Sequence, residues 1–237
     1  MLVVSRINHL HRIRLHSSSS HARTRRRVNA SRSIDESLAR ARTTRWVDDV
    51  VIGRNVCPFA SNARMRVRNE WLDVVVTNAH ALDVVIRAVA REALTLVGDE
   101  RDERDDARRA TTVLVVAANC EELRRFGDFL NVVEVCEGVL RAIGCEGRVQ
   151  IVGFHPEYAF AGEDAGDAAS YTNRSPYPMF HLLRESDVAR ASLEMNVSEI
   201  LKTNAKTLRD IGKDALAEYL TRLRRGDFDD VAAPSEK

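Results

Sequence analysis

The fold is decided by the stretch TTVLVVAA at residues 111–118, in which every position after the two threonines is apolar. Successive side chains of a strand point to opposite faces of its sheet, so a strand that is apolar throughout is covered on both faces. Residues 70–77 (EWLDVVVT) and 148–154 (RVQIVGF) are also rich in β-branched residues and predict two further strands. We therefore expect a small sheet of at least three strands covered by helices.

Amphipathic helices are predicted before, between and after these strands. Apolar residues recur at spacings near 3.6 residues in three segments, which are 34–51, 82–97 and 123–143. Asn196 and Glu199 have the spacing of a helix capping box, and Gly212 divides the last helical region, which ends near residue 225. The order α-β-α-β-α-β-loop-α predicts a single α/β domain over residues 34–225.

The two ends of the chain differ from this domain in composition. The formal net charge is +1, but residues 1–34 hold eight arginines and no acidic residue, so the remainder carries −7. Arginine- and serine-rich N-termini without acidic residues are typical of transit peptides. We expect residues 1–33 to be a cleavable transit peptide to the chloroplast stroma of a plastid, or alternatively to the mitochondrial matrix. The other interpretation of residues 1–33 is a disordered basic tail. At the C-terminal end, residues 226–237 are expected to form a flexible acidic tail.

Composition and motifs disfavour several function classes. An acidic body lacks the broad basic face of nucleic-acid-binding proteins, so we expect no nucleic-acid partner. No apolar run is long enough for a membrane span, so we expect no membrane partner. The sequence has no P-loop, no dinucleotide-binding glycine pattern and no nucleophile-elbow serine. The sequence does not indicate a cofactor or an oligomeric state. Its four cysteines form no CxxC pair, which argues against a zinc site of cysteines.

The first candidate site is the segment Arg54-Asn55-Val56-Cys57-Pro58-Phe59. Proline favours the first turn of a helix, so a helix that begins at Pro58 would place Cys57 at its N-cap. The helix dipole and the nearby Arg54 would then stabilise a thiolate and lower the pKa of the thiol. Cys57 is therefore a candidate nucleophile or redox group, with Arg54 and Asn55 as substrate-binding residues. The alternative is a buried Cys-Pro turn whose thiol packs in the core.

The second candidate is His155, which directly follows the strand predicted at 148–154. Open α/β sheets bind ligands outside the carboxyl ends of their strands. A histidine at that place could act as a general base, a phosphate partner or a metal ligand. The alternative is a turn histidine that is hydrogen-bonded to the local backbone. Tyr158 follows in the same loop as a candidate substrate-binding residue.

The third candidate is the second half of the loop 155–178, which is rich in aromatic residues and prolines. Loops of this length are commonly functional. The candidate donors for an anionic small molecule are Asn173, Arg174, Ser175 and Tyr177. The alternative is a rigid loop that its tyrosines hold down.

Pro178 also predicts the start of a helix. Such a helix would place His181 and Arg184 on one face, because residues three apart are neighbours on a helix surface. Together with Arg174 they would bind an anionic group at the helix start. A metal site through His155, His181 and an acid (Glu157, Glu163 or Asp164) is a weaker hypothesis, because the spacing matches no recognised ligand pattern, and we assign no metal ligand.

Three segments occur in a characteristic order and spacing: Asn55-Val56-Cys57-Pro58-Phe59, then Phe154-His155-Pro156 with Tyr158 and Phe160, then YTNRSPYP at 171–178. In these segments the chain resembles the domain of unknown function 1415 family, over roughly residues 40–212. The resemblance implies a compact single domain. Because that family is uncharacterised, the resemblance implies no reaction.

Three functions follow as hypotheses. The leading one is a small-molecule enzyme in which Cys57 is the nucleophile or redox group and His155 is the base, with Arg174 and Arg184 holding an anionic part of the substrate. The alternative is a non-catalytic module that uses the same loops to bind an anionic metabolite or a protein partner. The third is a metal-dependent hydrolase that uses His155 and His181.

Overall fold

Strand β2, Thr112–Val116, lies inside a four-stranded sheet, and all five of its residues are buried. The strand order is β1-β2-β4-β3, with β1 at Leu72–Val76, β3 at Val149–Phe154 and β4 at Met179–Arg184. β1 runs parallel to β2, whereas β4 runs antiparallel to both β2 and β3. The three strands expected from the sequence are confirmed, and β4 is an additional strand.

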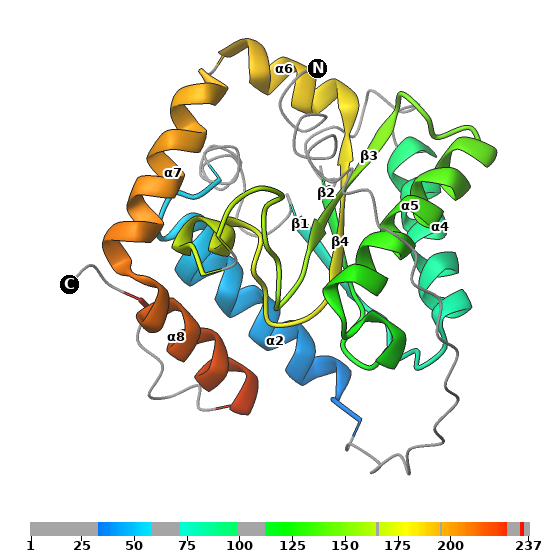
Figure 1. Cartoon of the computed structure of the whole chain (residues 1–237). Coiled ribbons are helices and arrows are strands. Elements are labelled where there is room, and N and C mark those ends of the chain that lie inside the picture. Colours follow the sequence, from blue (N-terminus) through cyan, green and yellow to red (C-terminus); the bar gives the residue numbers. More distant parts are fainter. Residues whose placement is uncertain are drawn as a thin grey trace.

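The computed structural model describes residues 33–57, 72–98, 112–164, 166–194, 196–226 and 233–234. In these ranges six α-helices pack against the sheet, which confirms the expected α/β domain (Figure 1). No helix of the described ranges is long and apolar enough to cross a membrane. Nearly all of the expected transit peptide and most of the expected acidic tail lie outside the described residues.

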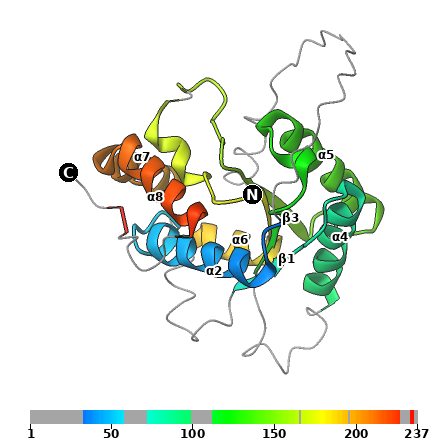
Figure 2. The same cartoon turned by 90° about the horizontal axis from the view of Figure 1, so that it is seen from below.

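Helices cover both faces of the sheet (Figures 1 and 2). One face, called the α4 face below, is covered by α4, Leu82–Gly98, and α5, Phe126–Ala142. The opposite face, called the α2 face, is covered by three α-helices and a π-helix. These are α2 (Glu36–Trp46), the π-helix η1 (Val47–Ile52), α7 (Val197–Ile211) and α8 (Lys213–Arg225). Helix α6, Glu185–Glu194, continues directly from β4.

Strand β2 separates two apolar cores. Leu114 and Val116 belong to the core of the α2 face, whereas Val113 and Val115 belong to that of the α4 face. Burying one such aliphatic side chain stabilises the fold by about 1.5–3 kcal/mol. Because side chains alternate along a strand, a strand between two cores must be apolar at successive positions, which is the pattern of TTVLVVAA.

The prediction of a helix that begins at Pro178 is wrong, because Met179–Arg184 form strand β4. Proline fits the first position of a strand as well as that of a helix. The pairing of β4 with β2 on one side and β3 on the other decides between the two, and that pairing is not a local property. The correction matters for the site, since His181 and Arg184 now point to opposite faces of the sheet.

Two predicted helix boundaries in the C-terminal region are confirmed. The Asn196 side chain accepts a hydrogen bond from Glu199 N at 3.3 Å, at the start of α7. Gly212 has a φ of 91°, which side-chain-bearing residues rarely adopt, and it separates α7 from α8.

The long loop 155–178 contains a short 3₁₀ helix, η5, Ala168–Thr172, which is tied to α7. Asp167 accepts a hydrogen bond from Ala169 N at 2.9 Å and so caps η5. The same carboxylate receives two hydrogen bonds from Arg209 of α7, at 3.0 and 2.6 Å. These bonds, led by those from Arg209, lower the pKa of Asp167 to about 2.

We expect Asp167→Ala to lower the free energy of unfolding by about 1 kcal/mol at pH 7, the size of a lost capping interaction. Asp210→Ala is the control, because it removes the exposed Lys206–Asp210 pair (2.5 Å) and should change stability by less than about 0.5 kcal/mol. Urea denaturation measures both. The advantage of the wild type should persist above about pH 4 and be lost toward pH 2, because the Asp167 pKa is lowered in the folded state to about 2. Equal stability of Asp167→Ala and the wild type at pH 7 would contradict the role of Asp167.

Candidate functional site

Cys57 differs from the other three cysteines in exposure. All four cysteines lie in the described ranges and form no disulfide, and Cys57 is partly exposed whereas Cys120, Cys136 and Cys145 are buried. Burial raises the pKa of Cys120 to about 11 and that of Cys136 to about 12, and it also raises the pKa of Cys145. The native fold therefore has one accessible thiol, at the position that the sequence marked as reactive.

Cys57 ends a turn, residues 53–57, whose backbone is fixed by the π-helix η1. The amides of Val56 and Cys57 both donate to Val51 O, at 3.1 and 3.2 Å. Asn55 has a φ of 52°, a left-handed conformation that asparagine adopts more readily than most residues. Single π-turns within helices are frequent at functional sites. The helix expected to begin at Pro58 lies outside the described residues.

A buried asparagine ties this turn to α7. The Asn204 side-chain amide donates to Val56 O, and Asn204 is only 6% exposed. Without this donor, a buried carbonyl would lose a hydrogen bond, which costs about 1–3 kcal/mol. Sequence reasoning missed Asn204. Its signal is a polar residue on the apolar stripe of a helix, midway between Ile200 and Leu208.

Arg54 precedes Cys57 by three residues and is only partly exposed. Its amide donates to Val50 O at 3.1 Å, which fixes the backbone at this position. Its Nε is buried without a hydrogen-bond partner, and within the part of the chain that the structure describes its guanidinium makes no hydrogen bond or ion pair. The turn therefore combines an accessible thiol with an unpaired cation.

His155 lies on the α4 face, with both ring nitrogens engaged. Its Nε2 is 2.9 Å from Leu123 O, and its Nδ1 accepts a hydrogen bond from Glu157 N at 3.0 Å. A carbonyl only accepts, so Nε2 carries the proton. The ring packs on Phe126 and Phe129, at centroid distances of 5.4 and 5.2 Å, and is fully buried. Burial lowers the pKa of His155, and neither nitrogen is open to a substrate in this conformation.

The polar residues of the 173–175 segment are buried and hold the loop together. Asn173 donates through its side-chain amide to Gly153 O at 3.1 Å, and its own carbonyl accepts from His155 N at 3.1 Å. The Ser175 hydroxyl donates to Tyr177 O at 2.6 Å, and Ser175 is fully buried. These contacts tie the segment to the end of β3 and to the backbone of its own loop.

The basic and aromatic residues of the same loop also bond within the protein. Arg174 Nε donates to Tyr158 O at 2.9 Å, and its guanidinium lies over the Tyr171 ring, 4.5 Å from the centroid. The Tyr177 hydroxyl accepts from Arg42 Nη1 of α2 at 3.0 Å. Tyr158 is almost fully buried, and burial raises the pKa of its hydroxyl.

His181 and Arg184 of β4 lie on opposite faces of the sheet. Arg184 reaches α4, where its Nε donates to Leu96 O at 3.1 Å. His181 hydrogen-bonds the Thr112 hydroxyl and contacts the Phe154 ring, with centroids 5.9 Å apart, on the α2 face. Burial lowers the pKa of His181 to about 4, so the ring is neutral at pH 7.

The three candidate segments do not assemble as one pocket in this structure. Arg54, Asn55 and Cys57 share one turn on the side of the α2 face, and His181 is the candidate histidine of that face. His155 and Arg184 are across the sheet, against α5 and α4. The pairing of Cys57 with His155 that the sequence proposed is therefore not formed.

The geometry also bears on the hypothesis of a metal site. His155 and His181 face opposite sides of the sheet, and His155 has no nitrogen left for a ligand bond. Among the described residues, no three histidine, cysteine or acidic side chains gather in an arrangement that could hold a metal ion.

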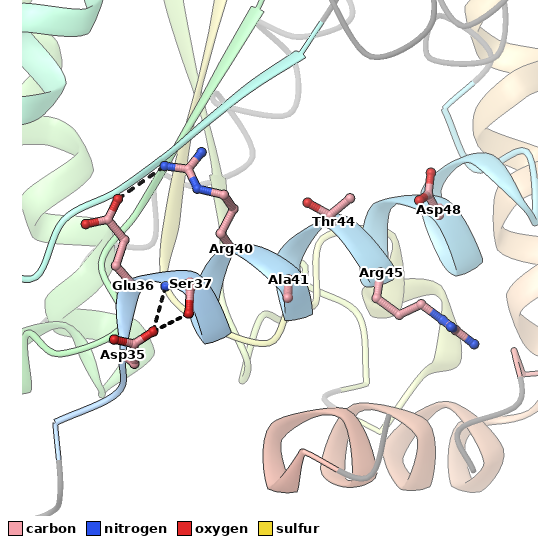
Figure 3. Close-up of a pocket in the computed structure, with 8 residues that line it drawn as sticks. All are labelled: Asp35, Glu36, Ser37, Arg40, Ala41, Thr44, Arg45 and Asp48. Atoms are coloured by element: carbon pink, nitrogen blue, oxygen red, sulfur yellow. Dashed lines mark hydrogen bonds and ion pairs between the residues drawn. The ribbon is translucent and has the colours of Figure 1, made fainter. Parts of the chain in front are cut away.

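A depression of about 760 Å³ runs along the solvent side of α2 (Figure 3). Its lining residues are Asp35, Glu36, Ser37, Arg40, Ala41, Thr44, Arg45 and Asp48. Several of these side chains bond to each other or to neighbours: Glu36 pairs with Arg40 at 3.3 Å, and Arg45 pairs with Asp49 at 2.5 Å. The side chains leave the helix in different directions and converge on no common point, so we assign no function to this depression.

Comparison with known proteins adds a family and no relative. The family model described as "Protein of unknown function (DUF1415)" matches residues 38–218. No curated protein and no solved structure matches the chain.

We expect His155 to remain a neutral Nε2–H imidazole at pH 7 and to titrate below its ordinary value, because burial lowers its pKa. Two-dimensional ¹H–¹⁵N NMR of the histidine rings reports both the tautomer and the midpoint. His155→Gln should lower the free energy of unfolding by about 2 kcal/mol, since it breaks two buried hydrogen bonds. It should leave the pH profile of Cys57 alkylation in the folded protein unchanged. A profile shifted upward in this variant would show that His155 and Cys57 are coupled.

Proposed function

This chain belongs to the DUF1415 family of proteins of unknown function, and we propose that it is a small-molecule enzyme whose reactive group is the thiol of Cys57. One observation carries the proposal: Cys57 is the partly exposed cysteine in a fold that buries the other three. Thiols that serve structure are usually buried and inert, whereas reactive thiols are accessible and lie in electropositive surroundings.

Two features of the turn support a chemical role. The π-helix η1 and the Asn204 amide hold the backbone that leads to Cys57, so the position of this residue is defined by hydrogen bonds at Val56 and Cys57. Arg54 places a cation in the same turn, and a nearby cation stabilises a thiolate. In this proposal Arg54 keeps the part expected from the sequence, which is stabilisation of the charged thiolate, and His155 is not the base, because both of its ring nitrogens are bonded.

A second candidate is a non-catalytic module that binds its ligand at the same turn. The observation in its favour is the bonding of His155, whose two nitrogens are occupied on the far side of the sheet. Without that histidine the turn lacks the general base of a thiol–imidazole pair. This candidate requires an ordinary thiol at Cys57 and saturable binding without turnover.

We also propose the plastid stroma as the compartment of the mature protein, with the mitochondrial matrix as the alternative. The support is the arginine- and serine-rich, acid-free composition of residues 1–33. A fluorescent fusion of the full chain and one of residues 34–237 would separate targeting by this segment from targeting by the domain.

In the native protein, we expect a neutral alkylating reagent to modify Cys57 alone, with the three buried cysteines reacting only after unfolding. The alkylation midpoint of Cys57 should lie at least about one pH unit below the free-thiol value of about 8.5. Site-resolved mass spectrometry over a pH series measures this. Cys57→Ser is the matched control and should abolish native-state labelling without loss of the fold.

The two candidates give opposite results in this measurement. A depressed midpoint supports the enzyme and justifies a search among thiol-dependent reactions. A midpoint at the free-thiol value, or a Cys57 that resists the reagent, would reject the thiol mechanism and favour the binding module.

A further inference from the structure

A groove of about 880 Å³ lies between strand β1 and helix α4. It is lined by residues 75–77 at the end of β1 and by α4 residues between Val84 and Thr95. Val84 and Leu94 are 40% and 49% exposed, and they are two of the five large apolar residues that the described ranges leave exposed. Exposed apolar side chains that gather in one place commonly mark an interaction site.

The backbone of β1 can accept one more strand. Among the described residues β1 pairs only with β2, so it is an edge of the sheet. Thr77 N donates to Val116 O at 2.9 Å, and the alternate residues Val74 and Val76 therefore direct their amide and carbonyl groups away from β2. The Arg40 side chain of α2 donates to Val74 O, which shows that this carbonyl accepts a donor from outside the sheet. Open strand edges are templates for pairing with another chain.

Two arginines give the groove a positive charge. Arg87 and Arg91 line it, and no acidic residue of the described ranges does so, although the chain after residue 34 carries a formal net charge of −7. Arg87 pairs with Asp83, and Arg91 pairs with Glu92, both at 2.8 Å. Both arginine side chains are exposed, where such pairs contribute little to stability, so each guanidinium can turn to a carboxylate of a partner.

The spacing of these side chains matches that of an extended chain. Along the groove, α4 presents Val84, Arg87, Arg91 and Leu94 in that order. The two arginines are four residues apart, which is about 6 Å along the helix axis. Residues two apart on one face of a strand are about 6.8 Å apart. A strand beside β1 can therefore bring two carboxylates to the two arginines at once, with an apolar side chain beyond each.

A second copy of this chain fits the groove less well. Two-fold symmetric pairing of β1 with its own copy would place the two α4 helices side by side and antiparallel. Arg87 of one protomer would then lie near Arg91 of the other. Like charges oppose such a contact, so the charge of the groove favours an acidic partner.

We propose that the groove between β1 and α4 binds an extended acidic segment of a partner protein, which joins the sheet as a strand beside β1. The face of this segment toward α4 carries two carboxylates two residues apart, flanked by apolar side chains. Backbone hydrogen bonds to Val74 and Val76 hold the segment, and Arg87 and Arg91 select its charge. This goes beyond the proposed function, because the groove includes neither residue of the Cys57 turn, and the failure of one leaves the other standing.

Fluorescence anisotropy of the full chain with two labelled peptides tests the side-chain pattern. The peptide Leu-Thr-Glu-Thr-Glu-Thr-Leu carries both carboxylates on one face of a strand. The peptide Leu-Thr-Glu-Glu-Thr-Thr-Leu has the same composition but carries them on opposite faces, and we expect it to bind about fivefold more weakly or worse.

A double substitution tests the two arginines. Arg87→Gln with Arg91→Gln should weaken the first peptide by about three- to tenfold, the scale of two exposed ion pairs. Arg124→Gln with Arg141→Gln is the matched control and should leave binding unchanged, because these two arginines are also exposed and ion-paired but lie outside the groove.

Amide hydrogen exchange tests the backbone contact. The first peptide should slow exchange at Val74 and Val76 by about tenfold or more, as measured by ¹H–¹⁵N NMR. N-methylation of the peptide at alternate residues should abolish binding in one phase and spare it in the other, because alternate amides of a strand face the same neighbour.

Three results would overturn the proposal: no binding at about 1 mM of the first peptide, equal affinity for the two peptides, or unchanged exchange at Val74 and Val76. A dimer in sedimentation velocity that protects these amides without any peptide would also overturn it, because the occupant would then be a second copy of the chain.

Discussion

The sheet depends on one constraint: β2 is covered on both faces, so its side chains must serve two separate cores. Because of that constraint, the sheet lies in the middle of the domain with helices on both faces (Figures 1 and 2). Side chains that pack against the sheet therefore belong to one of its two faces. The sheet separates His155, packed against Phe129 on the α4 face, from the Cys57 turn on the side of the α2 face.

A second constraint is the cost of burying polar groups without partners. The 155–178 loop satisfies most of its buried polar groups internally: Asn173, Ser175 and His155 bond to backbone groups of the same loop or its neighbours. The Ser170 hydroxyl, which is buried without a partner, is not among them. A loop with so many apparent recognition residues thus uses them for its own structure. In the described ranges several buried side-chain atoms have no hydrogen-bond partner, among them Trp46 Nε1, Ser170 Oγ and Arg54 Nε.

Asn204 is a buried polar residue that has a hydrogen-bond partner and thereby holds the Cys57 turn. It stands on the buried side of α7, where a polar side chain is costly unless it is bonded, and it bonds the carbonyl of Val56. The Cys57 turn is therefore coupled to a helix far along the chain, which is in turn held to the 155–178 loop by Asp167 and Arg209.

The sequence by itself determined most of the helices and three of the four strands. Residues 111–118 predicted the central strand, the amphipathic pattern predicted α4, and Asn196 with Gly212 predicted the limits of α7. It also marked Cys57 and Arg54, because a thiol beside a cation and a proline is a local pattern. Tertiary structure alone decided that Met179–Arg184 is a strand, that the His155 ring is buried against α5 with both nitrogens bonded, and that Asn204 supports the turn. The physical reason is range: periodicity and capping act over a few residues, whereas strand pairing and the bonding of buried polar groups join residues far apart in the chain.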